Sequence, residues 1–432
     1  MRILLKDFTA ITLEDPPVRA GVSIAVEDGL IARIAGSLDE LPYPEREFDT
    51  VIPGKDKLVL PGFVNAHTHL AMTLLRGYAD DLPLMEWLRE KIWPLEAKLT
   101  PDDIYWGSVL GLCEMIRSGT TCFADMYFAM DRVARAVEES GLRALLSYGI
   151  IAPEPGEKLD RELKIAQEFI ERFHNSANGR VRAAVSPHAP YTCHLRVWER
   201  AVELAHEHHI LVHTHISETR TEVEEAQKRW GKTPVQYLRD LGVFEVPVLA
   251  AHCVHLTDED IATLKAHEVY PVHNPTSNLK LASGVAPVWR LLQEGMVVAL
   301  GTDGTASNND LDMIEEIRLA ALLQKGILQE ATALPALEAL KLGTAYGARA
   351  LGWADMGTIS VGKRADLVIL ETTGPHWVPD YDPVSQVVYA AKAADVTTVI
   401  VDGRIVMRDK EILTLDEERA KAEVKAFQRR HT

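Results

Sequence analysis

The sequence predicts an α/β protein, a (β/α)8 TIM barrel with a small β-sandwich domain built from both chain ends. Three observations predict this fold. Short β-rich runs broken by turn residues occupy both ends of the chain. In the middle, eight apolar, β-branched strands alternate with helical periodicity, which is typical of a parallel sheet. The ends of these middle strands carry histidines and an aspartate, as expected for the functional face of a barrel.

The two ends of the chain are expected to form the β-sandwich from residues 1–57 and 358–432. The N-terminal runs ILLKDFTAI, VSIAVEDG and LIARIAG are rich in strand-forming residues and are separated by Pro-Pro and Asp-Gly. Strands are also predicted at 365–371, 396–403 and 404–407. An Asp-Gly pair between the last two is a strong signal for a β-hairpin. The helix LDEERAKAEVKAFQRR then closes the chain.

Residues 58–357 are expected to form the barrel. Helical segments such as RVWERAVELAHEHH, TEVEEAQKRW and TDEDIATLKAHE separate most of its strands. No internal repeat is visible, so the number of strands alone predicts the barrel. The eight strands are predicted at residues 58–67, 120–126, 143–150, 181–188, 210–218, 246–253, 269–276 and 296–303.

Composition excludes several classes of function. The chain has 432 residues, 47% of them hydrophobic and 25% charged, as in folded globular proteins. Its net charge of −17 disfavours nucleic-acid and membrane-surface partners, because phosphates are repelled. The four cysteines form no C-x-x-C pair, and no apolar run approaches the roughly 20 residues of a membrane span. We therefore expect a cytoplasmic protein with a small-molecule partner.

The strand ends suggest a metal site. His67 and His69 are two residues apart, so both rings project to one side of an extended segment and can bind one cation. A third imidazole from strand 210–218 and the carboxylate of Asp303 would complete a shell for one Zn²⁺ or Fe²⁺. Nitrogen and oxygen ligands without thiolate favour a catalytic metal. By spacing alone, both His213 and His215 are candidates for the third imidazole.

Several motifs resemble those of the amidohydrolase superfamily: PGFVNAHTHLAMTLLRG, HISET, AHCVHL, HNPTSNLKL and LGTDGTASNN. More narrowly, they are similar to those of the 5-methylthioadenosine/S-adenosylhomocysteine deaminase family, from about Lys6 to about Met407. The resemblance implies a barrel, a β-sandwich made from both chain ends and one divalent metal ion, usually zinc. The strand that ends in Ser-Pro-His lacks the bridging Lys of binuclear relatives, which implies a single ion. The ligands implied are His67, His69, His215 and Asp303.

The resemblance also implies an activity and the residues that perform it. The reaction is hydrolytic removal of the 6-amino group from 5′-methylthioadenosine, S-adenosylhomocysteine, adenosine or 5′-deoxyadenosine, with release of ammonia. Glu218 lies three residues after His215, the spacing that favours His215 over His213 as the ligand. Glu218 is expected to protonate ring N1 and then the leaving ammonia. His252 and Asp303 are expected to accept or orient the proton of the attacking water, whose pKa a bound metal lowers.

Four residues are expected to contact the substrate besides Glu218. Glu96 matches a family glutamate that accepts hydrogen bonds from the ribose hydroxyls, and His188 matches a histidine near the purine. Trp87 offers a large apolar face that would wall the pocket. Tyr148 stands where some deaminases that favour S-adenosylhomocysteine have an arginine.

Tyrosine cannot supply the positive charge that pairs with the homocysteine carboxylate. Lys158 or Arg161, in the segment after the third strand, are the basic residues expected to compensate. The preferred nucleoside therefore stays open.

Two other functions remain as alternatives to nucleoside deamination. The first is a hydrolase of triazines or other amino-heterocycles on the same scaffold, and the second is a non-catalytic interaction protein of the same fold. Self-association into a homo-oligomer is a family-level expectation.

The remaining histidines have other expected roles. His273 is expected to support the pocket. The AHEHH cluster, formed by His206, His208 and His209, is expected to be solvated or to cap a helix.

Overall fold

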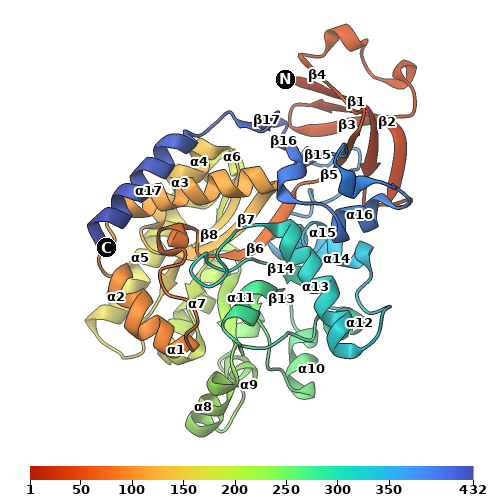
Figure 1. Cartoon of the computed structure of the whole chain (residues 1–432). Helices are drawn as coiled ribbons and strands as arrows, with labels where there is room; N and C mark the ends of the chain where they lie inside the picture. Colours follow the sequence, from red (N-terminus) through yellow and green to blue (C-terminus); the bar gives the residue numbers. More distant parts are fainter. Residues whose placement is uncertain (432) are drawn as a thin grey trace.

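The computed structural model describes residues 1–431, in which strands from both chain ends share one sheet and the middle of the chain forms two parallel sheets (Figure 1). The nine strands from the chain ends, here called the terminal sheet, run in the order β18-β17-β16-β15-β5-β1-β2-β3, with β4 paired to β1. Their bounds are β1 (Arg2–Ile11), β2 (Val18–Glu27), β3 (Leu30–Ala35), β4 (Thr50–Pro53), β5 (Lys57–Pro61), β15 (Leu367–Glu371), β16 (Val396–Val401), β17 (Arg404–Arg408) and β18 (Glu411–Ile412).

The Asp-Gly pairs of the terminal sheet form the tight turns that the sequence predicts. Between β16 and β17, Asp402 and Gly403 have φ values of 51° and 69°, as a type I′ turn requires at both central residues. The two strands pair antiparallel across this turn. Asp28 and Gly29 make the same kind of turn between β2 and β3, with φ values of 51° and 85°.

The parallel strands form one sheet of five strands and one of four. The first has the order β10-β8-β7-β6 with β9 beside β8, and the second has the order β11-β12-β13-β14. Their bounds are β6 (Phe63–Thr68), β7 (Thr120–Tyr127), β8 (Arg143–Ile150), β9 (Val181–Ala183), β10 (Ser186–Pro187), β11 (Val212–Ile216), β12 (Val248–His252), β13 (Val269–His273) and β14 (Ala299–Leu300).

The two parallel sheets meet at both of their edges. Val185 and Val212 form a parallel bridge at one edge, and at the other the Asp303 backbone N–H donates to the carbonyl of His67 at 2.9 Å. Apolar side chains from both sheets, such as Val64, Leu145 and Leu249, pack in one buried cluster. The carboxyl ends of all these strands therefore face the same side of the molecule.

Helices surround the parallel sheets, and short 3-10 turns connect several elements. The helices are α1 (Leu84–Glu86), the π-helical η4 (Trp87–Ile92), α2 (Trp93–Glu96), α3 (Pro101–Ser118), α4 (Met130–Ser140), α5 (Glu157–Phe173), α6 (Ser176–Gly179), α7 (Leu195–His208), α8 (Arg220–Trp230), α9 (Pro234–Asp240), α10 (Asp258–Ala266), α11 (Pro275–Lys280), α12 (Val288–Gln293), α13 (Met313–Leu328), α14 (Ala336–Leu342), α15 (Ala345–Ala350), α16 (Pro383–Tyr389) and α17 (Glu417–His431). The 3-10 turns are η1 (Leu38–Glu40), η2 (Glu45–Glu47), η3 (Leu70–Leu75), η5 (Pro190–Thr192), η6 (Val243–Glu245), η7 (Pro375–Trp377) and η8 (Ala393–Asp395).

Several strands differ from their predicted bounds. The strand predicted at 58–67 is divided at Gly62, so that β5 belongs to the terminal sheet and β6 to a parallel sheet. A side chain at Gly62 would lie 2.2 Å from Thr121, which explains why glycine stands at the crossing. The strand predicted at 269–276 ends at residue 273, because Pro275 begins α11.

The C-terminal helix does not lie on the terminal sheet but packs against the helices of the middle part. Figure 1 shows α17 beside α3, which also packs against α4. Arg117 of α3 donates to Glu417 of α17 at 2.9 Å. Among residues 1–431, none of the helices combines the length and the apolar character that crossing a bilayer requires.

Candidate active site

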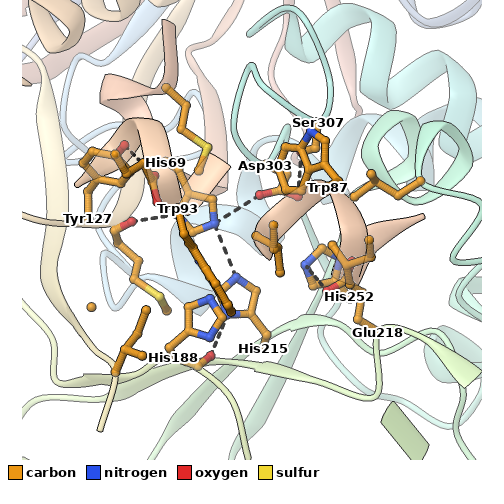
Figure 2. Close-up of a pocket in the computed structure, with 18 of the residues that line it drawn as sticks. His69, Trp87, Trp93, Tyr127, His188, His215, Glu218, His252, Asp303 and Ser307 are labelled. Carbon is orange, nitrogen blue, oxygen red and sulfur yellow. Dashed lines mark hydrogen bonds and ion pairs between the residues drawn. The ribbon is translucent and has the colours of Figure 1, made fainter. Parts of the chain in front are cut away.

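The candidate metal ligands come from three strands and meet at the carboxyl ends of the parallel sheets. His67 lies in β6 and His69 just beyond it, His215 lies in β11, and Asp303 follows β14. The Nε2 atoms of His67 and His69 lie 3.4 and 3.3 Å from Asp303 Oδ1. The Nε2 atoms of His69 and His215 lie 3.4 Å apart. Figure 2 shows His69 facing both Asp303 and His215 across the cavity.

Each of the three imidazoles uses its Nδ1 atom for a contact within the protein. His69 donates to the carbonyl of Met126 and His215 to the carbonyl of His188, both at 2.6 Å. His67 Nδ1 lies 2.9 Å from Nε2 of His213. The two carbonyl contacts favour the tautomers of His69 and His215 that keep an Nε2 lone pair directed toward the centre of the site.

A buried nitrogen atom without a hydrogen-bond partner among residues 1–431 indicates that this site can bind a divalent cation. Nε2 of His67 is buried and has no hydrogen-bond partner among the described residues, although it faces Asp303. Burial lowers the pKa of His67 to about 4, so the imidazole is in its neutral, metal-binding form near pH 7. Two ligand atoms of a tetrahedral zinc are about 3.4 Å apart, which is the separation found here. The residues fit such an ion.

Asp303 is held in place by hydroxyl groups and the backbone. Ser277 and Ser307 donate to its Oδ2 at 2.6 and 3.1 Å, and the Gly304 N–H donates to Oδ1 at 2.8 Å. Although burial opposes ionisation, the nearby imidazoles of His67, His69 and His252 hold the pKa of Asp303 well below its usual value. Asp303 also has a φ of 63°, an uncommon backbone conformation of the kind found at functional sites.

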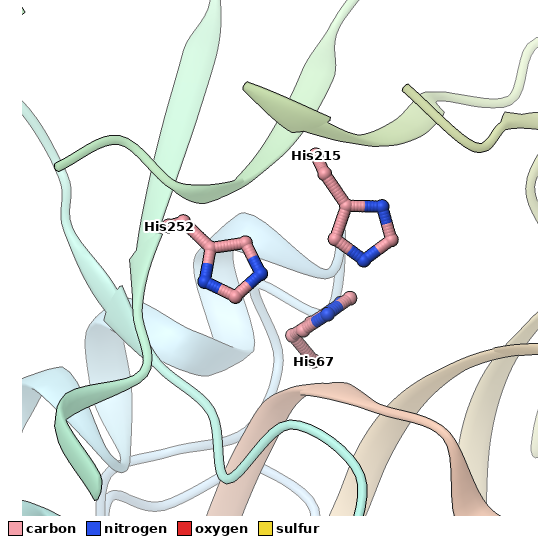
Figure 3. A group of neighbouring side chains, drawn as sticks. All are labelled: His67, His215 and His252. Atoms are coloured by element: carbon pink, nitrogen blue, oxygen red, sulfur yellow. The ribbon is translucent and has the colours of Figure 1, made fainter. Parts of the chain in front are cut away.

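A second trio of histidines offers an alternative grouping of ligands. Side-chain nitrogens of His67, His215 and His252 lie within 4.8 Å of one another, as do the ligand atoms of His67, His69 and Asp303. Figure 3 shows His215 and His252 on neighbouring strands, both facing the ring of His67. His67 belongs to both groups, so the two overlap in one site.

Glu218 and His252 form a pair at the edge of this cluster. Glu218 Oε2 lies 3.8 Å from His252 Nε2, and Glu218 Oε1 lies 3.4 Å from the hydroxyl of Ser283. Burial raises the pKa of Glu218. The charges of Glu218 and Asp303 raise the pKa of His252, although its burial acts in the opposite direction. The pair thus offers a buried carboxylic acid next to a basic imidazole, a combination suited to proton transfer.

The cluster opens into a cavity of about 70 Å³, here called the inner cavity. Three residues expected to contact the substrate line it: Glu96, His188 and Trp87. Figure 2 labels His188 and Trp87. The Trp87 indole donates to the Ala79 carbonyl at 3.0 Å, and Glu96 accepts a hydrogen bond from Tyr127 at 2.7 Å. These bonds fix both side chains at the cavity wall.

A larger cavity of about 780 Å³ adjoins the inner cavity, and we call it the outer cavity. Trp93 and Glu96 line both cavities, so they stand where the two meet. Tyr148, expected to contact the substrate, lines the outer cavity and not the inner one, and its hydroxyl donates to Glu162 at 3.0 Å. Lys158 also lines the outer cavity. Ligand pockets commonly measure about 300–1,000 Å³. Of the inner and outer cavities, the outer one falls within this range.

Comparison with known proteins identifies the family. A sequence model of the amidohydrolase family matches residues 58–406. The chain belongs to this family. It is 49% identical over 425 residues to a 5-methylthioadenosine/S-adenosylhomocysteine deaminase of Caldanaerobacter subterraneus subsp. tengcongensis, which covers 98% of this chain and 97% of the relative.

Solved structures agree with the family assignment. An adenosine deaminase from Xanthomonas campestris with bound zinc matches with a TM-score of 0.93 and 36% identity, over 99% of this chain and 98% of that one. An atrazine chlorohydrolase of Arthrobacter aurescens, complexed with zinc, matches with a TM-score of 0.89 and 24% identity, over 98% of this chain and 99% of that one. This second likeness shows the fold alone.

The sequence motifs of this amidohydrolase did not identify every residue that supports the site. Asn278 accepts, through Oδ1, a hydrogen bond from Nδ1 of His252 at 2.8 Å. The Asp125 carboxylate binds the Leu70 N–H at 2.7 Å and the Thr68 hydroxyl at 3.0 Å, on either side of His69. Asn278 lies in the quoted motif HNPTSNLKL, which was a usable signal, whereas nothing in the sequence links Asp125 to His69.

The remaining histidines of the amidohydrolase lie outside the cluster of ligand atoms. His213 contacts His67 instead of facing the inner cavity, and His273 is buried without a hydrogen-bond partner among the described residues. His209 ends α7 in a left-handed conformation, with a φ of 53°, and its N–H donates to backbone carbonyls of the last turn. The prediction that the AHEHH cluster caps a helix is confirmed for His209.

Proposed function

We propose that this amidohydrolase is a metal-dependent deaminase of adenosine-type nucleosides, including 5′-methylthioadenosine and S-adenosylhomocysteine. It replaces the 6-amino group of the purine by an oxo group and releases ammonia. The observation that carries the proposal is the buried Glu218–His252 pair, which adjoins the group of His67, His69 and Asp303 in one cavity. The full-length similarity to curated deaminases supports the same substrate class.

The ligands proposed for one divalent ion, zinc or iron(II), are His67, His69, His215 and Asp303. When bound there, such an ion supplies Lewis-acid activation of the attacking water. Its fit is supported by the unpartnered Nε2 of His67 and by the separations of the ligand atoms. The bound zinc of the adenosine deaminase from Xanthomonas campestris favours zinc.

The chain's own residues would move the protons. Glu218, whose pKa is raised by burial, donates a proton to ring nitrogen N1 as water adds to C6. Asp303 and His252 accept or orient the proton of the water. One of the two water protons then passes through Glu218 to the amino group, which leaves as ammonia. The other restores the proton of Glu218 as the tetrahedral carbon collapses to the oxo product. In this scheme His188, whose pKa burial lowers to about 3, faces the purine as a neutral imidazole.

The two cavities divide the substrate between them. The purine would lie in the inner cavity against Trp87, while Glu96, at the junction, accepts hydrogen bonds from the ribose hydroxyls. The 5′ substituent would then extend into the outer cavity. Because the outer cavity has room for more than a hydrogen atom or a hydroxyl, this arrangement favours 5′-thioether nucleosides over adenosine and 5′-deoxyadenosine.

The architecture belongs to the same proposal. The bonds at both edges of the parallel sheets support a single closed (β/α)8 barrel over residues 58–357. The terminal sheet would provide the β-sandwich from residues 1–57 and 358–432, with β5 joining it. A cytoplasmic location and a homo-oligomeric state stay predictions.

An ammonia-release assay tests the function. We expect turnover of 5′-methylthioadenosine and S-adenosylhomocysteine by protein loaded with zinc, and none of atrazine or melamine. Turnover of a triazine without turnover of any adenosine compound would replace the proposal by the alternative hydrolase reading. Metal analysis of the same sample should find about one ion per chain, and a protein without stoichiometric metal would contradict the mechanism.

A further inference from the structure

A buried glutamate side chain outside both cavities connects two segments of the site. Glu316 lies in the first turn of α13 and is 0% exposed. Its Oε1 accepts a hydrogen bond from Nδ2 of Asn308 at 2.8 Å, and its Oε2 accepts one from the backbone N–H of Thr276 at 3.2 Å. Thr276 belongs to the segment after β13, and Asn308 to the segment after β14. One side chain therefore binds both segments.

These two segments also hold Asp303. Ser277, next to Thr276, and Ser307, next to Asn308, both donate to Asp303 Oδ2, and their hydroxyls lie 3.0 Å apart. In addition, Asn308 Nδ2 donates at 2.8 Å to the carbonyl of Thr302, the residue before Asp303. The Ser277 hydroxyl can reach the Asp303 carboxylate only while the two segments stay together, and Glu316 binds both of them.

Glu316 is not needed to cap the N-terminal end of α13. The side chain of Asp312 already accepts a hydrogen bond from the Ile314 N–H at the start of α13. Glu315, in the same turn, is exposed and supplies negative charge near the helix N-terminus without being buried. Burying a carboxyl group has a free-energy cost that only specific hydrogen bonds offset, and here those bonds all lead to the Asp303 segments.

We propose that Glu316 is a positioning residue that orients Asp303 and thereby sets the affinity of the site for its divalent cation. The proposal rests on the proposed function in so far as Asp303 is a metal ligand. Glu316 contacts neither a candidate ligand nor the cavities. Its effect on the metal passes through Thr276–Ser277 and Ser307–Asn308.

The test is a Zn²⁺ titration of metal-free protein against a chromophoric chelator, with unfolding by denaturant measured in parallel. Glu316→Ala removes both bonds, and we expect the affinity for Zn²⁺ to fall about 10–100-fold, as for other residues that orient metal ligands. Glu316→Gln keeps one acceptor oxygen but turns an amide N–H₂ toward the Thr276 N–H, so its loss should be smaller. If the alanine variant does not fold, the glutamine variant decides the matter.

Asp260 offers a matched control. It is 0% exposed, lies in the first turn of α10, and accepts hydrogen bonds from the Thr233 hydroxyl and the Thr257 N–H, far from Asp303 in the chain. Asp260→Asn and Asp260→Ala should lower stability but leave the affinity for Zn²⁺ unchanged.

Folded Glu316 variants that bind Zn²⁺ as tightly as the parent would overturn the positioning role. The same result follows if the Asp260 variants lose equal affinity, since general destabilisation would then explain the effect. A parent protein that binds Zn²⁺ but releases no ammonia from any adenosine compound would contradict the proposed function alone.

Discussion

At the scale of single residues, the chemistry of the site depends on which nitrogen of each imidazole is free. His69 and His215 donate from Nδ1 to backbone carbonyls, so their Nε2 atoms carry lone pairs. His67 has no carbonyl there and instead meets His213, 146 positions later in the chain. Spacing along the strand makes His213 a rival ligand to His215, because spacing cannot distinguish a ligand from the residue that orients one.

The contact between His67 and His213 predicts an effect on metal binding. If His67 keeps its proton on Nδ1, then Nε2 of His213 accepts a hydrogen bond from it, and His213 donates from Nδ1 toward the Ser147 hydroxyl, 3.5 Å away. His213→Leu removes the acceptor and should lower the affinity for zinc about 10–100-fold. His213→Gln, which retains an acceptor oxygen, should lose less. Equal affinities of the leucine variant and the parent in a zinc titration would contradict this assignment.

Glu218 predicts both a rate and a pH profile. Glu218→Gln should bind metal normally but lose about 10²–10⁴-fold in kcat, because the amide cannot pass on a proton. Burial raises the pKa of Glu218, and an acid must be protonated to donate. Activity should therefore be retained below this pKa and fall as the pH rises through it. Ammonia release measured against pH checks the prediction, and unchanged kcat in the glutamine variant would exclude Glu218 as the acid.

At the scale of elements, the predicted strands agree with the structure to different degrees. β8 has the predicted bounds, 143–150, and it is paired with β7 and β9. In contrast, the strand predicted at 296–303 is reduced to the two residues of β14. The apolar character of MVVALGTD is real, since Val298 and Leu300 are fully buried, but burial alone does not require ladder hydrogen bonds.

The elements around the outer cavity predict substrate preference. Arg89 of η4 and Lys158 of α5 line this cavity, and neither has a hydrogen-bond or ion-pair partner in the described part of the chain. Both are therefore available to the carboxylate of S-adenosylhomocysteine, which 5′-methylthioadenosine lacks. The double variant Arg89→Ala/Lys158→Ala should raise KM for S-adenosylhomocysteine about five-fold, corresponding to about 1 kcal/mol for exposed ion pairs.

The same double variant should leave KM for 5′-methylthioadenosine unchanged. Arg161→Ala serves as the control, because Arg161 is exposed nearby but does not line the outer cavity. Steady-state kinetics with both substrates measures the difference. An equal rise of KM for the two nucleosides, or the same rise in the control, would show that these cations do not recognise the carboxylate.

At the scale of the whole molecule, a buried ion pair joins the parallel sheets to the terminal sheet. Arg143 of β8 is 1% exposed and donates to Asp366, which is 2% exposed, at 3.0 Å, and to Asp402 at 3.2 Å. Asp402 lies in the β16–β17 turn, and the carbonyl of Asp366 accepts from the N–H of Gly62 at 2.9 Å. The ion pair thus lies at the place where the chain crosses from one part to the other.

Removal of this arginine should destabilise the whole fold. Arg143→Met leaves the buried Asp366 without its charged partner, so we expect the free energy of unfolding to fall by about 3–5 kcal/mol. Arg196→Ala breaks an exposed pair with Asp160 and should cost at most about 1 kcal/mol. Denaturant unfolding measures both variants. A loss of under 1 kcal/mol in the methionine variant would mean that the two parts are held together without this ion pair.

The sequence by itself determined which residues stand at the strand ends. Alternation within a strand puts His67 and His69 on one side, and parallel strands bring residues such as His215, His252 and Asp303 to a common face. Only the tertiary structure decided the lateral contacts: Tyr148 faces the outer cavity, His213 supports His67, and Glu316 joins two loops. The physical reason is that periodicity records which face of an element is buried. Contacts between loops that are distant in the chain depend instead on how neighbouring elements pack.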